Sequence, residues 1–124
     1  MPKKILIIDD EEDMQVYLET VLQKAGYETE IAVNGEEGLK KLDHFKPNLI
    51  TLDILMPQKS GLNFFKSLRE NKKFKSIPVV VVSGVTAHSE FFKEEKNVGP
   101  TKFAEKPIVP DSFLVQVRNL LGEV

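Results

Sequence analysis

Residues 5–10 read Ile-Leu-Ile-Ile-Asp-Asp, and this stretch decides the fold class. A continuous run of apolar, mostly β-branched residues is typical of a strand that is covered on both faces. Two further runs have the same form: Leu49-Ile50-Thr51-Leu52 leads into Asp53, and Val79-Val80-Val81-Val82 leads into Ser83. Buried strands that each end in a polar residue predict a parallel sheet whose polar residues gather at one edge.

Amphipathic helices and two weaker strands are expected between and after these runs. In residues 12–25 the apolar positions, Tyr17 among them, recur at spacings of three and four, as on the buried stripe of a helix. Asn34 can cap the next helix, whose buried stripe we expect to be Leu39 and Leu42. The remaining elements are expected as helices after Gly61, near 86–96 and from Pro110, and as strands near 29–33 and 102–104. This alternation predicts one α/β domain over residues 1–124, a parallel five-stranded sheet with helices on both faces.

Composition excludes several classes of function. The chain has 124 residues, 41% of them hydrophobic, and no cysteine, which excludes a disulfide scaffold and a thiolate metal site. The histidines, His44 and His88, lie far apart in sequence, which argues against a zinc enzyme. A net charge of −2 argues against a nucleic-acid partner. The first apolar run is too short for a signal peptide or a membrane span, so we expect a soluble, cytoplasmic protein.

The polar residues that follow the strands should meet, because parallel strands bring their carboxyl ends to one edge of the sheet. The set consists of three carboxylates, a hydroxyl and an ammonium: Asp9, Asp10, Asp53, Ser83 and Lys106. Crowded carboxylates either take up a proton or bind a cation. Oxygen ligands without histidine or cysteine favour magnesium, calcium or manganese, and magnesium fits best.

These residue types suit phosphoryl transfer, in which a carboxylate can be the nucleophile and a lysine and a hydroxyl can bind oxygens of the transferred group. Each residue also has a purely structural interpretation. Asp9 and Asp10 could complement the following helix N-terminus, Asp53 could form a turn, Ser83 could mark a strand end, and Lys106 could be a solvated loop residue. Their combination favours the functional interpretation.

The chain resembles the receiver domain of two-component response regulators over essentially its whole length. The motifs that carry the resemblance are residues 5–10, Asp53 with Met56-Pro57 and Gly61, residues 80–84, and Phe103-Ala104-Glu105-Lys106-Pro107-Ile108. The resemblance implies a flavodoxin-like, doubly wound sheet in the strand order 2-1-3-4-5. It also implies a cis peptide bond between Lys106 and Pro107.

The resemblance implies a phosphorylation site with a metal beside it. Asp53 would be the phospho-acceptor, taking its phosphoryl group from a histidine kinase or a histidine phosphotransfer protein. Asp9, Asp10, Asp53 and the backbone carbonyl of Leu55 would hold Mg²⁺, for which Mn²⁺ could substitute. The protein would then be a signalling switch and not an enzyme that turns over an external substrate.

The resemblance also implies how the signal leaves the site. Ser83 and Lys106 would bind phosphoryl oxygens, and Phe103 would turn inward as Ser83 moves toward the phosphate. The surface of the fourth helix, fifth strand and fifth helix would change and bind a downstream protein. No output domain is expected within the chain, which would act as a monomer or a phosphorylation-dependent dimer. The aromatic residues Phe91, Phe92 and Phe113 are expected near that surface.

Two positions depart from the common receiver pattern. Leu55 and Val85 are apolar where polar side chains often occur, and neither can orient an attacking water, so we expect slow self-dephosphorylation. A haloacid-dehalogenase-like phosphatase is disfavoured, because it needs a second aspartate where Leu55 stands. The alternative that stays open is a receiver-fold interaction module that is no longer phosphorylated.

Overall fold

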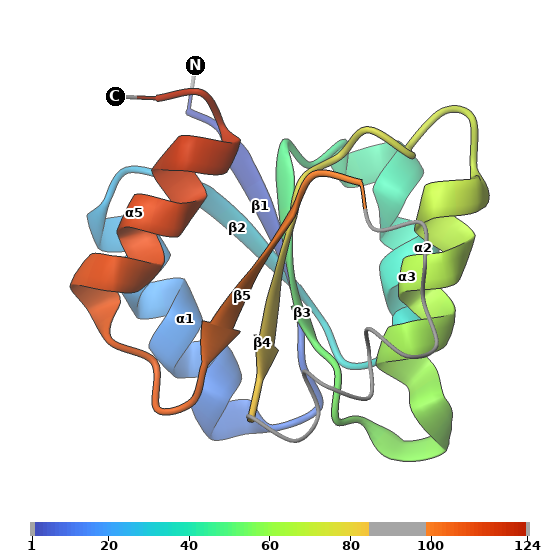
Figure 1. Ribbon diagram of the computed structural model, residues 1–124, viewed down its shortest axis with the longest axis horizontal. Coiled ribbons are helices and arrows are strands. Elements are labelled where there is room, and N and C mark those ends of the chain that lie inside the picture. The colour runs from blue at the N-terminus through green and yellow to red at the C-terminus, as the bar shows by residue number, and fades with distance from the viewer. Residues whose placement is uncertain (1, 85–98, 124) are drawn as a thin grey trace.

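Five parallel strands form one sheet in the order β2-β1-β3-β4-β5 (Figure 1). The computed structural model describes residues 2–84 and 99–123. Its strands are β1 (Lys4–Ile8), β2 (Glu28–Ala32), β3 (Leu49–Asp53), β4 (Val79–Ser83) and β5 (Thr101–Glu105). Its helices are α1 (Glu12–Lys24), α2 (Gly35–Phe45), the short 3₁₀ helix η1 (Pro57–Lys59), α3 (Ser60–Glu70) and α5 (Pro110–Leu120). The expected parallel sheet and its strand order are therefore confirmed.

Helices cover both faces of the sheet, as expected: α1 and α5 lie on one side and α2 and α3 on the other (Figure 1). Successive strand residues point to opposite faces, so Ile5 and Ile7 of β1 pack in the α1 and α5 layer and Leu6 and Ile8 in the α2 and α3 layer. All four side chains are at most 1% exposed. This explains why the apolar run of β1 is continuous.

The α2 helix corrects one expectation from the sequence. Asn34 caps it as predicted, because its Oδ1 accepts a hydrogen bond of 2.8 Å from the Glu37 backbone N–H. Leu39, however, is 39% exposed, so its assignment to the buried stripe was wrong. The inner face instead comprises Gly35, Gly38, Leu42 and Phe45. A Cβ on Gly38 would lie 2.6 Å from Ile8 Cδ1, so the missing side chain lets α2 approach the sheet closely.

Tyr17 of α1 is a second correction. The sequence pattern placed it in the buried stripe, but the side chain is 38% exposed. Leu18 and Leu22 are the buried residues of this helix. The Tyr17 hydroxyl reaches across to donate a hydrogen bond of 2.9 Å to the backbone carbonyl of Ile108.

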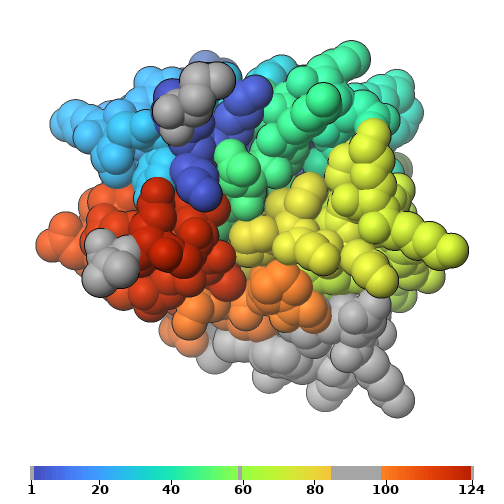
Figure 2. All heavy atoms as spheres, turned by 90° about the horizontal axis from the view of Figure 1, so that it is seen from above, coloured from blue at the N-terminus to red at the C-terminus, as the bar shows by residue number. Residues whose placement is uncertain are grey.

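The first described residues, dark blue in Figure 2, lie beside the C-terminal segment, drawn in red, at the sheet edge where β1 begins. There the Tyr27 hydroxyl donates a hydrogen bond of 2.7 Å to Glu123 Oε1. The Lys106–Pro107 peptide bond, at the other edge, is cis, as the resemblance implied. The helix expected near 86–96, with His88, lies outside the described residues. No helix within 2–84 or 99–123 is long and apolar enough to span a bilayer.

Substituting Thr51→Val should stabilise the protein. Thr51 is 1% exposed, and its hydroxyl has no hydrogen-bond partner in the described part of the chain. Removing an unsatisfied buried hydroxyl while keeping the side-chain shape should raise the free energy of unfolding by about 1 kcal/mol. Urea denaturation measures this change. The control Thr101→Val should destabilise, because Thr101 Oγ1 accepts a hydrogen bond of 3.0 Å from Arg69 Nη2. A lower midpoint for Thr51→Val would contradict the interpretation.

Candidate functional site

Polar residues from four strands meet at the carboxyl edge of the sheet. Asp9 follows β1, Asp53 ends β3, Ser83 ends β4 and Lys106 follows β5. Asp53 pairs with Val82 in the ladder between β3 and β4, which sets its height beside Ser83. The structure therefore brings together residues that the sequence spreads over nearly a hundred positions.

Four carboxylates form the centre of the site. Asp9, Asp10, Glu11 and Asp53 each offer an oxygen, and these oxygens lie within 4.8 Å of one another. Asp9 and Asp53 are each 1% exposed, whereas Asp10 and Glu11 face solvent. Sequence reasoning did not assign Glu11 to the site, although its place directly after Asp10 was the available signal.

Burial, together with the charges of neighbouring acids, raises the pKa values of both buried acids. Burial is the largest cause of raising the pKa of Asp9 to about 6, and the charges of Asp53 and Asp10 add to it. The hydrogen bond from the Glu11 backbone and the charge of Lys106 oppose this shift. Burial likewise raises the pKa of Asp53. The resting site therefore holds its negative charge at an energetic cost that a cation would relieve.

Each buried carboxylate has one oxygen fixed and one oxygen free of hydrogen bonds. Oδ1 of Asp9 accepts from the Glu11 backbone N–H at 2.9 Å, and Oδ1 of Asp53 accepts from the Leu55 backbone N–H at 2.9 Å. The two Oδ2 atoms have no hydrogen-bond partner among the described residues. Unpartnered carboxylate oxygens in a close group fit a hard divalent cation, whose preferred ligands are oxygens.

Lys106 and Ser83 border the acids. The Lys106 Nζ lies 3.9 Å from Asp53 Oδ1 and 4.0 Å from Glu11 Oε1, which is beyond hydrogen-bond distance. The Lys106 backbone N–H donates a hydrogen bond of 2.9 Å to the Ser83 carbonyl, so β4 places the start of the lysine loop. Ser83 is fully buried, and its hydroxyl has no partner in the described part of the chain. A lysine and an unpaired hydroxyl beside an acid can bind oxygens of an anionic group.

Comparison with known proteins identifies the family. The chain matches the family described as "Response regulator receiver domain" over residues 5–118. The chain belongs to this family.

Individual relatives agree with this assignment. The chain is 35% identical over 123 residues to the alkaline phosphatase synthesis transcriptional regulatory protein PhoP of Bacillus subtilis, covering 98% of this chain and 49% of that protein. It is 32% identical over 124 residues to the chemotaxis protein CheY of Thermotoga maritima, covering 99% and 100%. The solved structure of the chemotaxis response regulator CheY4 of Vibrio cholerae superposes with a TM-score of 0.85 at 30% identity, covering 97% and 99%. The chain thus spans about half the length of some curated relatives, PhoP included.

The remaining predicted residues of this receiver domain have mixed outcomes. Phe103 is partly buried and packs against the core on the α2 and α3 side. Leu55 is 60% exposed beside Asp53. Phe113, expected near the output surface, is a residue of α5 that is 2% exposed and packs in the core, so its side chain is not available to a partner. Val85, Phe91 and Phe92 lie outside the described residues.

Gly61 lets α3 pack directly on the end of β3, and Gly61→Ala should disrupt this contact. A Cβ there would collide with the Asp53 carbonyl oxygen and lie 3.0 Å from Ile54 Cα, and both are backbone atoms. Such overpacking should cost about 1–3 kcal/mol. Gly84→Ala is the control, because its Cβ meets no described atom within 4 Å. Equal urea midpoints for the two variants would show that the collision is relieved at no cost.

The metal-free receiver domain should lose stability through Asp9 as pH rises from about 4 to about 6. The folded state holds the Asp9 proton more tightly, with a pKa of about 6 against 3.8 for an ordinary aspartate. The resulting stabilisation is complete below the lower value and lost above the higher one, and amounts to about 3 kcal/mol.

The measurement is urea denaturation in chelator across this pH range. Asp9→Asn keeps the oxygen that bonds Glu11 and removes the titration. The variant should therefore gain stability relative to wild type as pH rises. A constant difference between the two proteins would contradict the assigned cause.

Proposed function

We propose that this receiver domain accepts a phosphoryl group on Asp53 from a histidine kinase or a histidine phosphotransfer protein, and that the modification changes its partner-binding surface. The observation that carries the proposal is the environment of Asp53. Its carboxylate is held by one oxygen, its other oxygen is unpartnered, and Lys106 lies 3.9 Å away. A group so placed can attack phosphorus without first breaking a hydrogen bond of its own.

The reaction requires Asp53 to act as an anion. Oδ2 of Asp53 forms the new bond to phosphorus while the bond from phosphorus to the donor nitrogen breaks, and the electron pair of that bond leaves with the donor. The fixed Oδ1 keeps the carboxylate plane oriented during the attack. Lys106 favours the ionised carboxylate and opposes the effect of burial on its pKa.

The acid cluster supports a role for Mg²⁺. Asp9, Asp10 and Asp53 would hold the ion, together with the backbone carbonyl of Leu55, and Mn²⁺ could substitute. The bound ion would neutralise charge on the acids and on the phosphoryl oxygens. Glu11, which shares the cluster, would remain at its solvent side.

Ser83, Lys106 and Phe103 would connect the phosphoryl group to the surface. The free hydroxyl of Ser83 and the ammonium of Lys106 would bind phosphoryl oxygens. Movement of Ser83 toward the phosphate would make room for Phe103, which is partly buried at the edge of the sheet. The phosphate would thereby bias a two-state surface that includes β5 and α5 and binds a downstream protein. In this scheme the domain is a switch and not a turnover enzyme.

Phosphorylation by a small donor tests the proposal. Purified protein is incubated with Mg²⁺ and acetyl phosphate, and the gain of a phosphoryl group is followed by intact mass. Wild type should gain one group, Asp53→Asn should gain none, and chelator should abolish the reaction. Beryllofluoride should shift the backbone NMR resonances of β5 in wild type. No gain and no shift in wild type would favour an interaction module that is no longer phosphorylated.

The phosphorylated domain should lose its phosphate slowly, because Leu55 and Val85 cannot orient water. The double substitution Leu55→Asn with Val85→Glu should speed phosphate loss by about tenfold, since a positioned polar group assists proton transfer from water. The rate is measured after removal of the donor. Leu39→Asn is the control, because it changes a leucine that is also exposed, at 39%, but lies on α2. An unchanged rate of phosphate loss in the double variant would contradict the proposal that Leu55 and Val85 slow dephosphorylation.

A further inference from the structure

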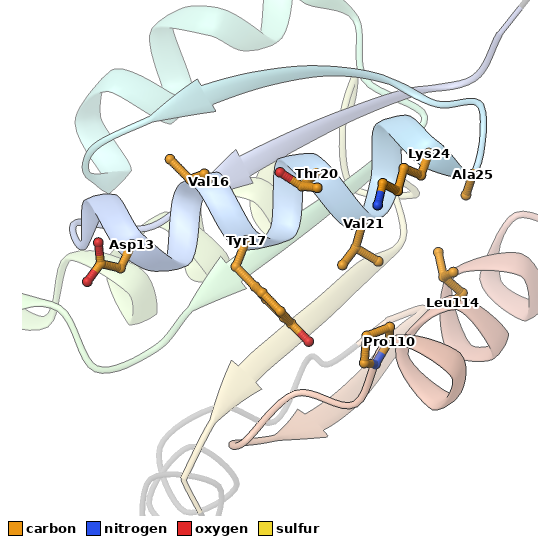
Figure 3. A pocket seen from close by; sticks show the side chains of 9 residues that line it. All are labelled: Asp13, Val16, Tyr17, Thr20, Val21, Lys24, Ala25, Pro110 and Leu114. Atoms are coloured by element: carbon orange, nitrogen blue, oxygen red, sulfur yellow. The ribbon is translucent and has the colours of Figure 1, made fainter.

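A tyrosine of helix α1 is hydrogen-bonded to the loop that follows Lys106. The Tyr17 hydroxyl donates a hydrogen bond of 2.9 Å to the Ile108 carbonyl, across 91 positions of sequence. Figure 3 shows the ring extending from α1 toward the loop that precedes Pro110. Ile108 lies two residues after Lys106 and is 8% exposed.

We propose that Tyr17 is a positioning residue for phosphoryl acceptance. Its hydroxyl fixes the backbone that follows Lys106 and thereby sets where the Lys106 ammonium stands relative to Asp53. The inference rests on the proposed function and adds to it a residue that lies outside the acid cluster and the phosphate-binding groups.

Lys106 depends on its backbone for its position. Its Nζ lies 3.9 Å from Asp53 and 4.0 Å from Glu11, so no hydrogen bond within the site holds the ammonium. A flexible four-carbon side chain then follows the movements of the loop that carries it. On one side of the residue the loop is anchored by the hydrogen bond from the Lys106 backbone N–H to Ser83. The bond from Tyr17 to Ile108 anchors the other side.

The same helix also holds the acidic half of the site. Gln15 Nε2 donates a hydrogen bond of 2.7 Å to the Asp9 carbonyl, and the Gln15 backbone N–H donates one of 3.0 Å to the Glu11 carbonyl. The α1 helix is therefore bonded both to the loop of the acids and to the loop of the lysine. Loss of the Tyr17 hydrogen bond would loosen the loop of Lys106, while Gln15 would still hold the loop of the acids.

Tyr17→Phe isolates the hydroxyl from the rest of the side chain. The ring lines a groove between α1 and α5 with Val21, Pro110 and Leu114, and phenylalanine keeps these apolar neighbours (Figure 3). The chain also offers a matched control. Tyr27→Phe removes a tyrosine hydroxyl that bonds Glu123 at the opposite edge of the sheet, away from the site.

The experiment compares wild type, Tyr17→Phe, Tyr27→Phe and Asp53→Asn in phosphorylation by acetyl phosphate with saturating Mg²⁺. Tyr17→Phe should lower the maximal rate about three- to tenfold, since small displacements of a catalytic group are costly. Mg²⁺ affinity should be unchanged, because Gln15 still holds the acids. Tyr27→Phe should lower thermal stability by about as much as Tyr17→Phe does, because each variant loses one hydrogen bond. It should leave the phosphorylation rate unchanged.

A double-mutant cycle tests whether Tyr17 acts through Lys106. In a Lys106→Ala background, followed over hours, Tyr17→Phe should have no further effect. Equal rates for Tyr17→Phe and Tyr27→Phe would overturn the inference, as would an equal fractional loss in both Lys106 backgrounds. Those results would leave the proposed function intact. Failure of wild type to react more than Asp53→Asn would instead overturn the proposed function, and the inference with it.

Discussion

The burial of two carboxylates, Asp9 and Asp53, within one acidic cluster is the constraint on which the rest of this site depends. Asp9 and Asp53 are each 1% exposed, and their neighbours Asp10 and Glu11 carry charge of the same sign. Burial and this crowding raise the pKa of Asp9 to about 6 and that of Asp53 in the same direction. The site is thus unfavourable as it stands and becomes favourable when positive charge enters it. Lys106 supplies part of that charge, and a cation would supply the rest.

The fold enforces this arrangement through its two central strands. β1 and β3 pair side by side, with Ile8 opposite Leu52, so the acids that follow them cannot move apart. The apolar residues of both strands are buried between two helical layers, which fixes their register. Backbone N–H groups then hold one oxygen of each acid and leave the other available. The packed sheet therefore holds the carboxylates close together despite their like charges, and this arrangement favours a cation.

The sheet and the convergence of the site could be predicted because each strand carries its own local signal. A buried apolar run that ends in an acid, as at Asp53, predicts both the strand and the polar residue at its carboxyl end. The errors concern positions that local spacing does not determine. Leu39 and Tyr17 were misplaced because the side that a helix turns to the core depends on its neighbours. For Leu39 the neighbour is the sheet, which α2 approaches closely at Gly38. The hydrogen bond from Tyr17 to Ile108 joins residues 91 positions apart, and local sequence patterns do not predict such a contact.

The most direct test of the electrostatic interpretation is the effect of Mg²⁺ on the stability of the unphosphorylated protein at two pH values. Urea midpoints are measured with Mg²⁺ and with NaCl at equal ionic strength, at pH 7.5 and at pH 4.5. The cation should raise the midpoint at pH 7.5, where Asp9 is ionised, and much less at pH 4.5, where Asp9 holds its proton. An effect of Mg²⁺ that NaCl reproduces, or that is the same at both pH values, would contradict the claim that the charge of buried, crowded carboxylates governs the site.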